Sequence, residues 1–242
     1  MAGDHRIPAG RTEGSGDVMT LLVATALVKS FGQTPALLGA DLSVDAGEIV
    51  AVLGPSGSGK STLLHCAAGI LQADAGSVRY SGAELTTMSD QQRSSLRRNA
   101  FGFIFQFGQL IGELTCRENV ALPLRLAGQS RQQAETAADE WLDRLDVVGV
   151  ANQRPTEISG GQGQRVAVCR ALVTDPRVIF ADEPTGALDS LQGERVMTQL
   201  VAAVRTSGAA LVLVTHEPRL AAYSDREVLV RDGRTSQSPV PA

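Results

Sequence analysis

A glycine-rich loop with one lysine lies between an apolar run and a run of helix-forming residues. Residues 54 to 62 read Gly-Pro-Ser-Gly-Ser-Gly-Lys-Ser-Thr and fit the pattern Gly, four residues, Gly-Lys-Ser/Thr. Residues 48 to 53 are typical of a buried parallel strand, and residues 61 to 68 contain no proline. Glycines let backbone amides close on phosphate oxygens, and the positive end of the helix dipole attracts the same anion. A glycine-rich turn entering an ordinary helix is the alternative, but the flanking strand and helix favour nucleotide binding.

Two side chains of this loop add a charge and a metal ligand to the backbone amides. Lys60 brings a full positive charge to the phosphates, and the Ser61 hydroxyl can bind magnesium. The residues expected to hold the nucleotide here are Gly54, Ser56, Gly57, Ser58, Gly59, Lys60, Ser61 and Thr62.

An acidic pair follows the apolar run Val178–Ala181. Asp182, at a strand end beside a phosphate loop, is expected to hold magnesium through water. Glu183 points to the other side of the backbone and is the candidate general base for an attacking water. A solvated acidic turn is the alternative, and the phosphate loop upstream favours catalysis.

Two further polar residues stand where strands are expected to end. His216 follows the buried run Ala210–Thr215, and its imidazole can donate to a γ-phosphate and orient the water of Glu183. The amide of Gln106 can accept from a metal-bound water and donate to the attacking one. Both residues have structural alternatives, as a core histidine and an ordinary loop glutamine.

A second glycine-rich helix start occurs at Ser159, Gly160, Gly161 and Gln162. Its exposed amides and serine hydroxyl form another anion-binding helix N-terminus, with a flexible cap as the alternative. One phosphate group needs one cradle. Two cradles in one chain therefore predict a head-to-tail dimer, in which the second cradle of each copy covers the first of the other.

Strands alternate with helices along the chain, which predicts a parallel sheet covered on both faces. The carboxyl ends of its strands would gather the phosphate loop, the acidic pair and His216. A turn is expected at 32–36, and Asp232-Gly233 is expected to close a hairpin-like edge. On the helix 131–145, Ala134, Ala138, Trp141, Leu145 and Val148 are expected to share the core face. The expected strands are 21–28, 42–44, 48–53, 76–80, 101–105, 178–181, 210–215 and 227–230, and the helices are 61–68, 89–98, 115–127, 131–145, 161–174 and 190–206.

Length and composition indicate one globular domain. The chain has 242 residues, 43% of them hydrophobic, and its net charge of −4 gives no support to nucleic-acid binding. No apolar run approaches the ~20 residues of a membrane span. The three cysteines lack metal-site spacing and fit buried thiols in a reducing compartment. Residues 1–18 and 235–242 are expected to be disordered tails, and Met19 is a candidate translation start.

The ordered set of motifs resembles that of ABC-type ATPase subunits over residues 20 to 233. The Walker A, Q-loop, signature, Walker B, D-loop and H-loop motifs correspond to Gly54–Thr62, Gln106, Ile158–Gln162, Val178–Glu183, Ala187–Ser190 and His216. The resemblance implies an α/β fold of the P-loop NTPase class, ABC ATPase type. It has a parallel-sheet core, an antiparallel β subdomain and a helical subdomain at about 107–158, all within one domain spanning 19–234.

The resemblance also implies ATP and Mg²⁺ as ligands of a sandwich dimer with two ATP sites. Each site would combine Walker A of one chain with the signature of the other. Phe31 would stack on adenine, and Asp189 would link the two sites. Magnesium would be held by Ser61, Gln106 and Asp182, and the catalytic residues would be Glu183, His216 and Gln106.

Residues 182–190 and 114–123 resemble one subgroup, which serves FtsX-like permeases in lipoprotein release, macrolide export and peptide-antibiotic defence. The chain would then lie in the cytoplasm on the inner face of the cell membrane, bound to its permease, with no nucleic-acid partner. Two alternatives remain open, a soluble ABC-type ATPase and a regulatory ATPase that gates a membrane partner without transport.

Two residues depart from the family pattern. Ile158 replaces leucine, and Gly163 stands where a polar side chain is usual. We expect Gly163 to leave the chain active with slower turnover, because it loosens the first turn of its helix. Unchanged hydrolysis in Gly163→Gln would remove any role for this departure.

Overall fold

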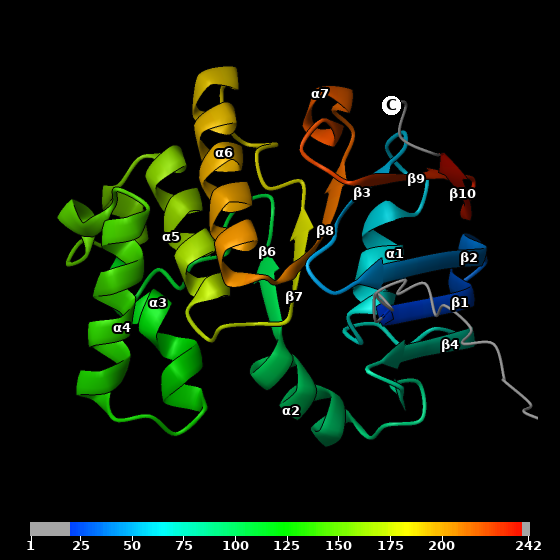
Figure 1. The fold of residues 1–242 in the computed structure, drawn as a ribbon, viewed down its shortest axis with the longest axis horizontal. Helices are drawn as coiled ribbons and strands as arrows, with labels where there is room; N and C mark the ends of the chain where they lie inside the picture. Colours follow the sequence, from blue (N-terminus) through cyan, green and yellow to red (C-terminus); the bar gives the residue numbers. More distant parts are fainter. Residues whose placement is uncertain (1–19, 239–242) are drawn as a thin grey trace, which may run out of the picture.

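The computed structural model describes residues 20 to 238 (Figure 1). The expected tail 1–18, the candidate start Met19 and the last four residues of the expected carboxyl-terminal tail lie outside this range. None of the helices in the described range combines the length and the low polarity that a membrane span requires.

Within the described residues a six-stranded sheet runs in the order β10-β9-β3-β8-β7-β6. Its four inner pairings are parallel, and only β10 runs antiparallel to its neighbour β9. The inner strands are short apolar runs because both faces of the sheet are covered. The expected parallel core is confirmed. The strands are β3 (Ile49–Leu53), β6 (Phe101–Ile104), β7 (Val178–Asp182), β8 (Ala210–Thr215), β9 (Arg226–Arg231) and β10 (Arg234–Ser238).

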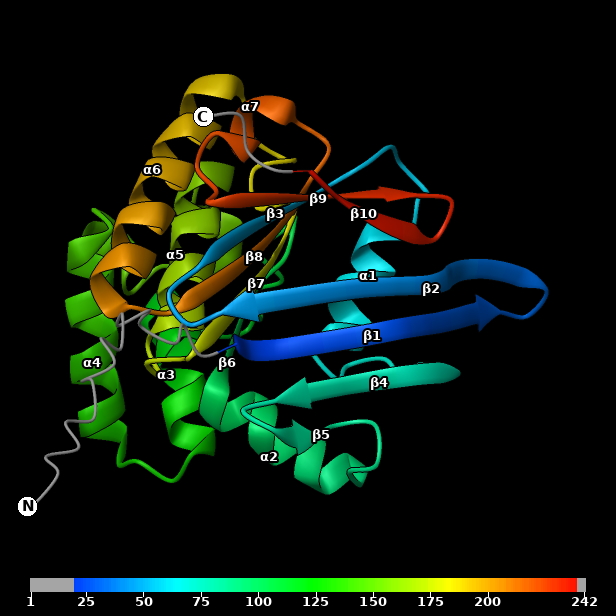
Figure 2. The ribbon, with the colours of Figure 1, turned by 45° about the vertical axis from the view of Figure 1, so that its right-hand side comes forward.

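Alternate residues of the inner strands pack into two separate hydrophobic cores, one on each face of the sheet. In β7, Ile179 and Ala181 pack with α5 (Gly160–Leu172) and α6 (Ser190–Ser207), whereas Val178 and Phe180 pack with α1 (Lys60–Ala67). This follows from the period of two along a strand. The helices α1 and α5 therefore lie on opposite faces of the sheet, as Figures 1 and 2 show.

A four-stranded antiparallel sheet, ordered β2-β1-β4-β5, covers α1 from the far side (Figure 2). Its first two strands are longer than predicted, and the turn between them is two residues, not the expected 32–36. Phe31 pairs directly with Thr34, so Gly32 and Gln33 alone make the turn. The strands are β1 (Thr20–Phe31), β2 (Thr34–Asp45), β4 (Ala75–Tyr80) and β5 (Ala83–Glu84).

The helices α2, α3 and α4 begin at side chains that cap them. Ser89, Thr115 and Ser130 each accept from the backbone amide three residues on, whose Gln or Glu side chain accepts from the cap residue's amide in return. The helices α3 and α4 pack on each other and on α5 (Figure 1). The helices are α2 (Asp90–Ala100), α3 (Cys116–Leu126), α4 (Arg131–Arg144) and α7 (Pro218–Ala221), with single 3₁₀ turns at Val148–Val150 and Pro155–Glu157.

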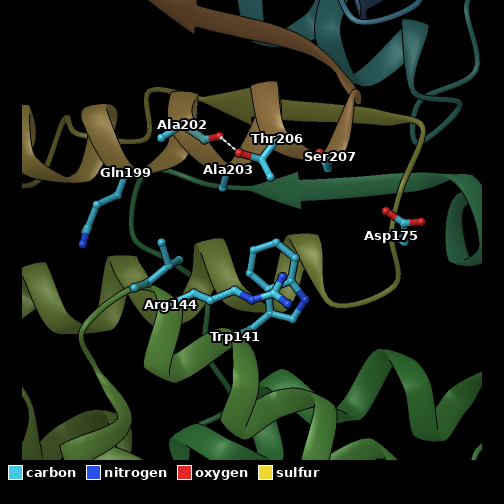
Figure 3. A pocket seen from close by; sticks show the side chains of 9 residues that line it. Trp141, Arg144, Asp175, Gln199, Ala202, Ala203, Thr206 and Ser207 are labelled. Carbon is cyan, nitrogen blue, oxygen red and sulfur yellow. Dashed lines mark hydrogen bonds between the residues drawn. The ribbon is translucent and has the colours of Figure 1, made fainter.

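The prediction for the core face of α4 is wrong at Val148 and omits Leu142, while Trp141 packs against the core from its edge. Leu142 is fully buried, while Trp141, one position earlier, is half-buried and lines a hollow of about 480 Å³ between α4 and α6 (Figure 3). The guanidinium of Arg144 lies over the indole, 4.9 Å from its centroid. Val148 is 46% exposed because α4 ends at Arg144, so the helical spacing no longer applies there.

The carboxyl-terminal prediction is also wrong for Thr235–Ser238, which form most of β10 rather than a disordered tail. Their polar sequence gives no strand signal of its own. The strand exists because it pairs with β9 and because the hydroxyl of Thr235 accepts from the amide of Asp41 in β2, at 2.8 Å.

Candidate active site

The carboxyl ends of three parallel strands meet at one edge of the six-stranded sheet. Leu53 of β3 pairs with Thr215 of β8, and Asp182 of β7 pairs with Val214. The residues that leave these strands are the phosphate loop, Glu183 and His216, so the expected gathering at this edge is confirmed.

The phosphate loop wraps around the ammonium group of Lys60. This group donates to the carbonyl oxygens of Gly54 and Pro55, both at 2.9 Å, and the side chain is only 5% exposed. At the start of α1, Gly59 has φ of 106°, and a Cβ there would lie 2.4 Å from the carbonyl oxygen of Ala36. The loop therefore depends on glycine both for its left-handed backbone and for its close contact with β2.

A hydroxyl and a carboxylate lie together beside the loop. The Oγ of Ser61 donates to Oδ1 of Asp182 at 3.0 Å. Burial raises the pKa of Asp182, while the hydrogen bond from Ser61 acts to lower it. Hard oxygen donors of this kind suit Mg²⁺. No cluster of three or more His, Cys, Asp or Glu side chains that could hold a metal ion occurs in residues 20–238.

Glu183 has a left-handed backbone, with φ of 47°. Its amide still donates to the carbonyl of Val214 at 2.9 Å, so the turn away from β7 is held by the sheet. Such strain in a residue other than glycine is concentrated at functional sites. His216 Nδ1 lies 3.0 Å from Oε1 of this carboxylate.

Gln106 approaches the same carboxylate from another side. A Cβ built on Gly186 would lie 2.8 Å from Nε2 of Gln106 and 3.2 Å from Oε2 of Glu183. Both side chains thus converge on Gly186. The structure brings together the phosphate loop, Asp182, Glu183, Gln106 and His216, as the sequence predicted.

The second glycine-rich helix start lies on the other face of the sheet. Ser159 accepts from the amide of Gln162 at 3.3 Å, and the Gln162 side chain accepts from the Ser159 amide at 2.9 Å. This cap does not involve the first-turn amides of Gly160 and Gly161, of which Gly161 is buried. Gly160 is exposed, so a ligand can reach this end of α5.

Two other predicted residues stand apart from the carboxylate cluster. Phe31 is 53% exposed at the end of β1, with Lys29 Nζ 5.9 Å from its ring centroid. Asp189 caps α6 by accepting from the amide of Gln192 at 2.9 Å.

Sequence reasoning missed the side chains of α5 that hold the loop of Gln106. Gln164 Nε2 donates to the carbonyl of Phe105 at 3.0 Å. Arg170 donates to the carbonyls of Gly108 and Gln109, at 2.7 and 2.8 Å. These contacts join residues about sixty positions apart, and no local pattern marks them. These hydrogen bonds tie the loop that carries Gln106 to α5, the helix that Ser159 caps.

Gly163, in the first turns of α5, has room for a side chain. A Cβ there would lie 3.7 Å from Cδ1 of Ile158, which is ordinary van der Waals contact, and its φ is not positive. Gly163→Ala is therefore expected to raise the free energy of unfolding by about 0.5–1 kcal/mol, because alanine loses less backbone entropy in a helix. Urea unfolding measures this. Gly102→Ala is the contrasting variant, since its Cβ would lie 2.4 Å from the carbonyl oxygen of Ala171. A destabilised Gly163→Ala would show that this turn needs glycine.

The sequence of this chain is similar to those of known proteins. The family described as ABC transporter matches residues 37–186. The lipoprotein-releasing system ATP-binding protein LolD of Porphyromonas gingivalis is 41% identical over 213 residues, which cover 88% of this chain and 97% of that protein. LolD of Paramagnetospirillum magneticum is 45% identical over 197 residues, covering 81% and 87%.

Solved structures share the fold of this chain. The dimeric post-hydrolysis structure of the ATP-binding cassette MJ0796, bound to ADP and Pi, has a TM-score of 0.85 at 34% identity and covers 92% of this chain and 100% of that one. A second dimeric structure of MJ0796, a bacterial ABC transporter cassette, gives the same values. These likenesses confirm the expected α/β fold of the ABC ATPase type. The chain belongs to the ABC transporter family, as an ATP-hydrolysing subunit.

Proposed function

We propose that this chain binds ATP with magnesium at its phosphate loop, completes each hydrolytic site with a second copy of itself, and drives an FtsX-like permease in lipoprotein release. One observation carries the hydrolytic part. A hydroxyl–carboxylate pair, Ser61 with Asp182, and an imidazole–carboxylate pair, His216 with Glu183, stand at one sheet edge beside the phosphate loop. The substrate class comes from the LolD relatives, whose names state lipoprotein release.

The residues fit ATP with magnesium. Lys60 is already held inside the loop by two carbonyls, so it needs little ordering to meet the phosphates. Magnesium fits the oxygens of Ser61 and Asp182, with Gln106 as a further donor, and it would neutralise charge on the phosphate oxygens. The exposed ring of Phe31 is assigned to the adenine.

Glu183 is assigned as the general base. It takes a proton from water as the water oxygen bonds to the γ-phosphorus and the bond to the β–γ bridging oxygen breaks, which leaves ADP and phosphate. His216, 3.0 Å away, holds the carboxylate in place, and Gln106 limits its movement on the Gly186 side.

A second copy is needed because the two anion cradles lie on opposite faces of one sheet. The phosphate loop leads into α1, whereas Ser159–Gln162 begins α5. A head-to-tail dimer places the amides of Gly160 and Gly161 of one chain over the phosphates bound by the other. Asp189 lies near this junction, at the start of α6.

A groove of about 550 Å³ between α2, β6 and α3 is assigned to a cytoplasmic segment of the permease. Phe105 and Gln109, which flank Gln106 in the chain, line it, so its occupant can act on Gln106 through these neighbours. Arg97 and Arg98 of α2 stand at its rim, tied to the carbonyls of Gly69 and Leu126. The permease would keep the chain on the inner face of the cell membrane.

The permease assignment is tested by placing a negative charge in the groove. Leu126, 61% exposed in the groove, is replaced in Leu126→Glu, which is expected to abolish co-purification with the permease and lipoprotein release from reconstituted vesicles, while ATP binding is retained. Val148→Glu is the matched control, since Val148 is 46% exposed and does not line the groove. Equal co-purification of the two variants would place the permease elsewhere.

A further inference from the structure

The turn between β9 and β10 touches both the phosphate loop and β2. It consists of Asp232 and Gly233, with φ of 47° and 71°. The amide of Gly233 donates to the carbonyl of Ser58 in the phosphate loop at 3.0 Å. Its carbonyl accepts from the amide of Leu38 in β2 at 2.7 Å. The backbone of a single residue, Gly233, thus links the phosphate loop to β2.

This contact leaves no space for a side chain. A Cβ on Gly233 would lie 2.9 Å from the carbonyl oxygen of Ala36, and 3.0 Å from both Leu37 Cα and Leu38 N. All three atoms belong to the backbone of β2, which cannot turn aside as a flexible side chain can. Gly233 itself is buried.

The phosphate loop itself packs closely against β9 and β2. A Cβ on Gly54 would lie 2.2 Å from the carbonyl oxygen of Val230 in β9, and one on Gly59 would lie 2.4 Å from that of Ala36 in β2. The loop is therefore packed backbone against backbone, with β9 on one side and β2 on the other. Figure 2 shows β10 beside β2 and close to α1. The hydrogen bond from the Asp41 amide to Thr235 Oγ1, 2.8 Å long, adds a second tie between β10 and β2.

We propose that Gly233 is a positioning residue for ATP, which sets the phosphate loop against the β1–β2 hairpin that ends at Phe31. This inference rests on the proposed function of the phosphate loop. Gly233 touches no reacting atom, so its replacement is expected to weaken ground-state and transition-state binding alike. Such a change raises KM and leaves kcat unaltered.

The chain contains a matched control for this glycine. Ser81 and Gly82 form the turn between β4 and β5, with φ of 47° and 80°, nearly the values of Asp232 and Gly233. A Cβ on Gly82 meets nothing within 4 Å. Gly82→Ala and Gly233→Ala therefore carry the same left-handed backbone cost, and only the second introduces crowding beside the phosphate loop.

The test measures the Kd of ATP with magnesium by calorimetric titration, together with KM, kcat and thermal unfolding. Gly233→Ala is expected to raise Kd and KM about tenfold with kcat near wild type, a change that corresponds to about 1.4 kcal/mol. Gly82→Ala is expected to leave Kd and KM unchanged. Equal Kd values for the two variants, or a fall in kcat with KM unchanged in Gly233→Ala, would overturn the proposal.

If Gly233→Ala does not fold, Thr235→Val tests the same contact between β10 and β2. It removes the hydroxyl that accepts from Asp41 and adds no crowding at the loop. A smaller rise in Kd in the same direction is expected, and an unchanged Kd would count against the hairpin's role. Lys60→Ala tests the phosphate site itself, independently of Gly233. If it binds ATP as wild type does, the phosphate site itself is misassigned, whatever Gly233→Ala shows.

Discussion

Glu183→Gln is expected to lower ATP turnover by about 10²–10⁴-fold while ATP binding persists. Glutamine keeps the size of the side chain and its contacts with His216 and Gly186, but its amide cannot take a proton from water. The backbone of residue 183 is held by the sheet through the carbonyl of Val214, so the substitution leaves the turn intact. Without hydrolysis, the ATP that closes the dimer stays bound, and the variant accumulates as an ATP-bound dimer.

Single-turnover hydrolysis and size-exclusion chromatography with ATP measure the two parts of this result. Glu217→Gln is the control, because Glu217 follows His216 directly but pairs with Arg219, at 2.7 Å, rather than with the cluster. It should turn over ATP and return to monomers. Hydrolysis by Glu183→Gln at the wild-type rate would remove Glu183 as the base.

The parts of the site that the sequence predicted are those in which chemistry and local structure coincide. The loop from Gly54 to Thr62 needs only a strand before it and a helix after it. Asp182 and His216 end apolar runs, and parallel strands bring such ends to one edge. No long-range contact has to be known for these placements.

The failures have equally specific causes. Helical spacing places Trp141 and Leu142 only about 100° apart, so periodicity alone could not show that Leu142 is the more deeply buried of the two. The strand from Arg234 to Ser238 is made by its partners β9 and β2, not by its own residues. Gln164 and Arg170 act on carbonyls about sixty residues away, which no spacing rule reports.

Gly186 and Gly233 show a further limit of sequence reasoning. Each is a plain turn glycine in the sequence, and its importance appears only when the neighbouring atoms are known. Gly186 lets Gln106 and Glu183 approach each other, and Gly233 lets one residue hydrogen-bond to both β2 and the phosphate loop. Close approach of distant segments is the shared reason that both were missed.

A mixture of two inactive variants is expected to hydrolyse ATP. Lys60→Ala removes the buried ammonium group of the phosphate loop, and Ser159→Arg places a bulky cation at the exposed start of α5. Each variant alone forms dimers in which both sites are defective. A mixed dimer contains one site with an intact phosphate loop from one chain and an intact α5 N-terminus from the other. ATPase assays of each variant and of mixtures, combined as monomers before ATP is added, measure the recovery.

The loss of a helix cap has to be separated from the loss of an anion site. Ser159→Arg removes a capping side chain, which costs about 1 kcal/mol of stability in itself. Ser130→Arg is the matched control, because Ser130 caps α4 through the same reciprocal bonds, here with Gln133. It should retain full ATPase activity. If the mixture is no more active than its separate components while Ser130→Arg is active, each site lies within a single chain, and the two cradles of this protein serve different ends.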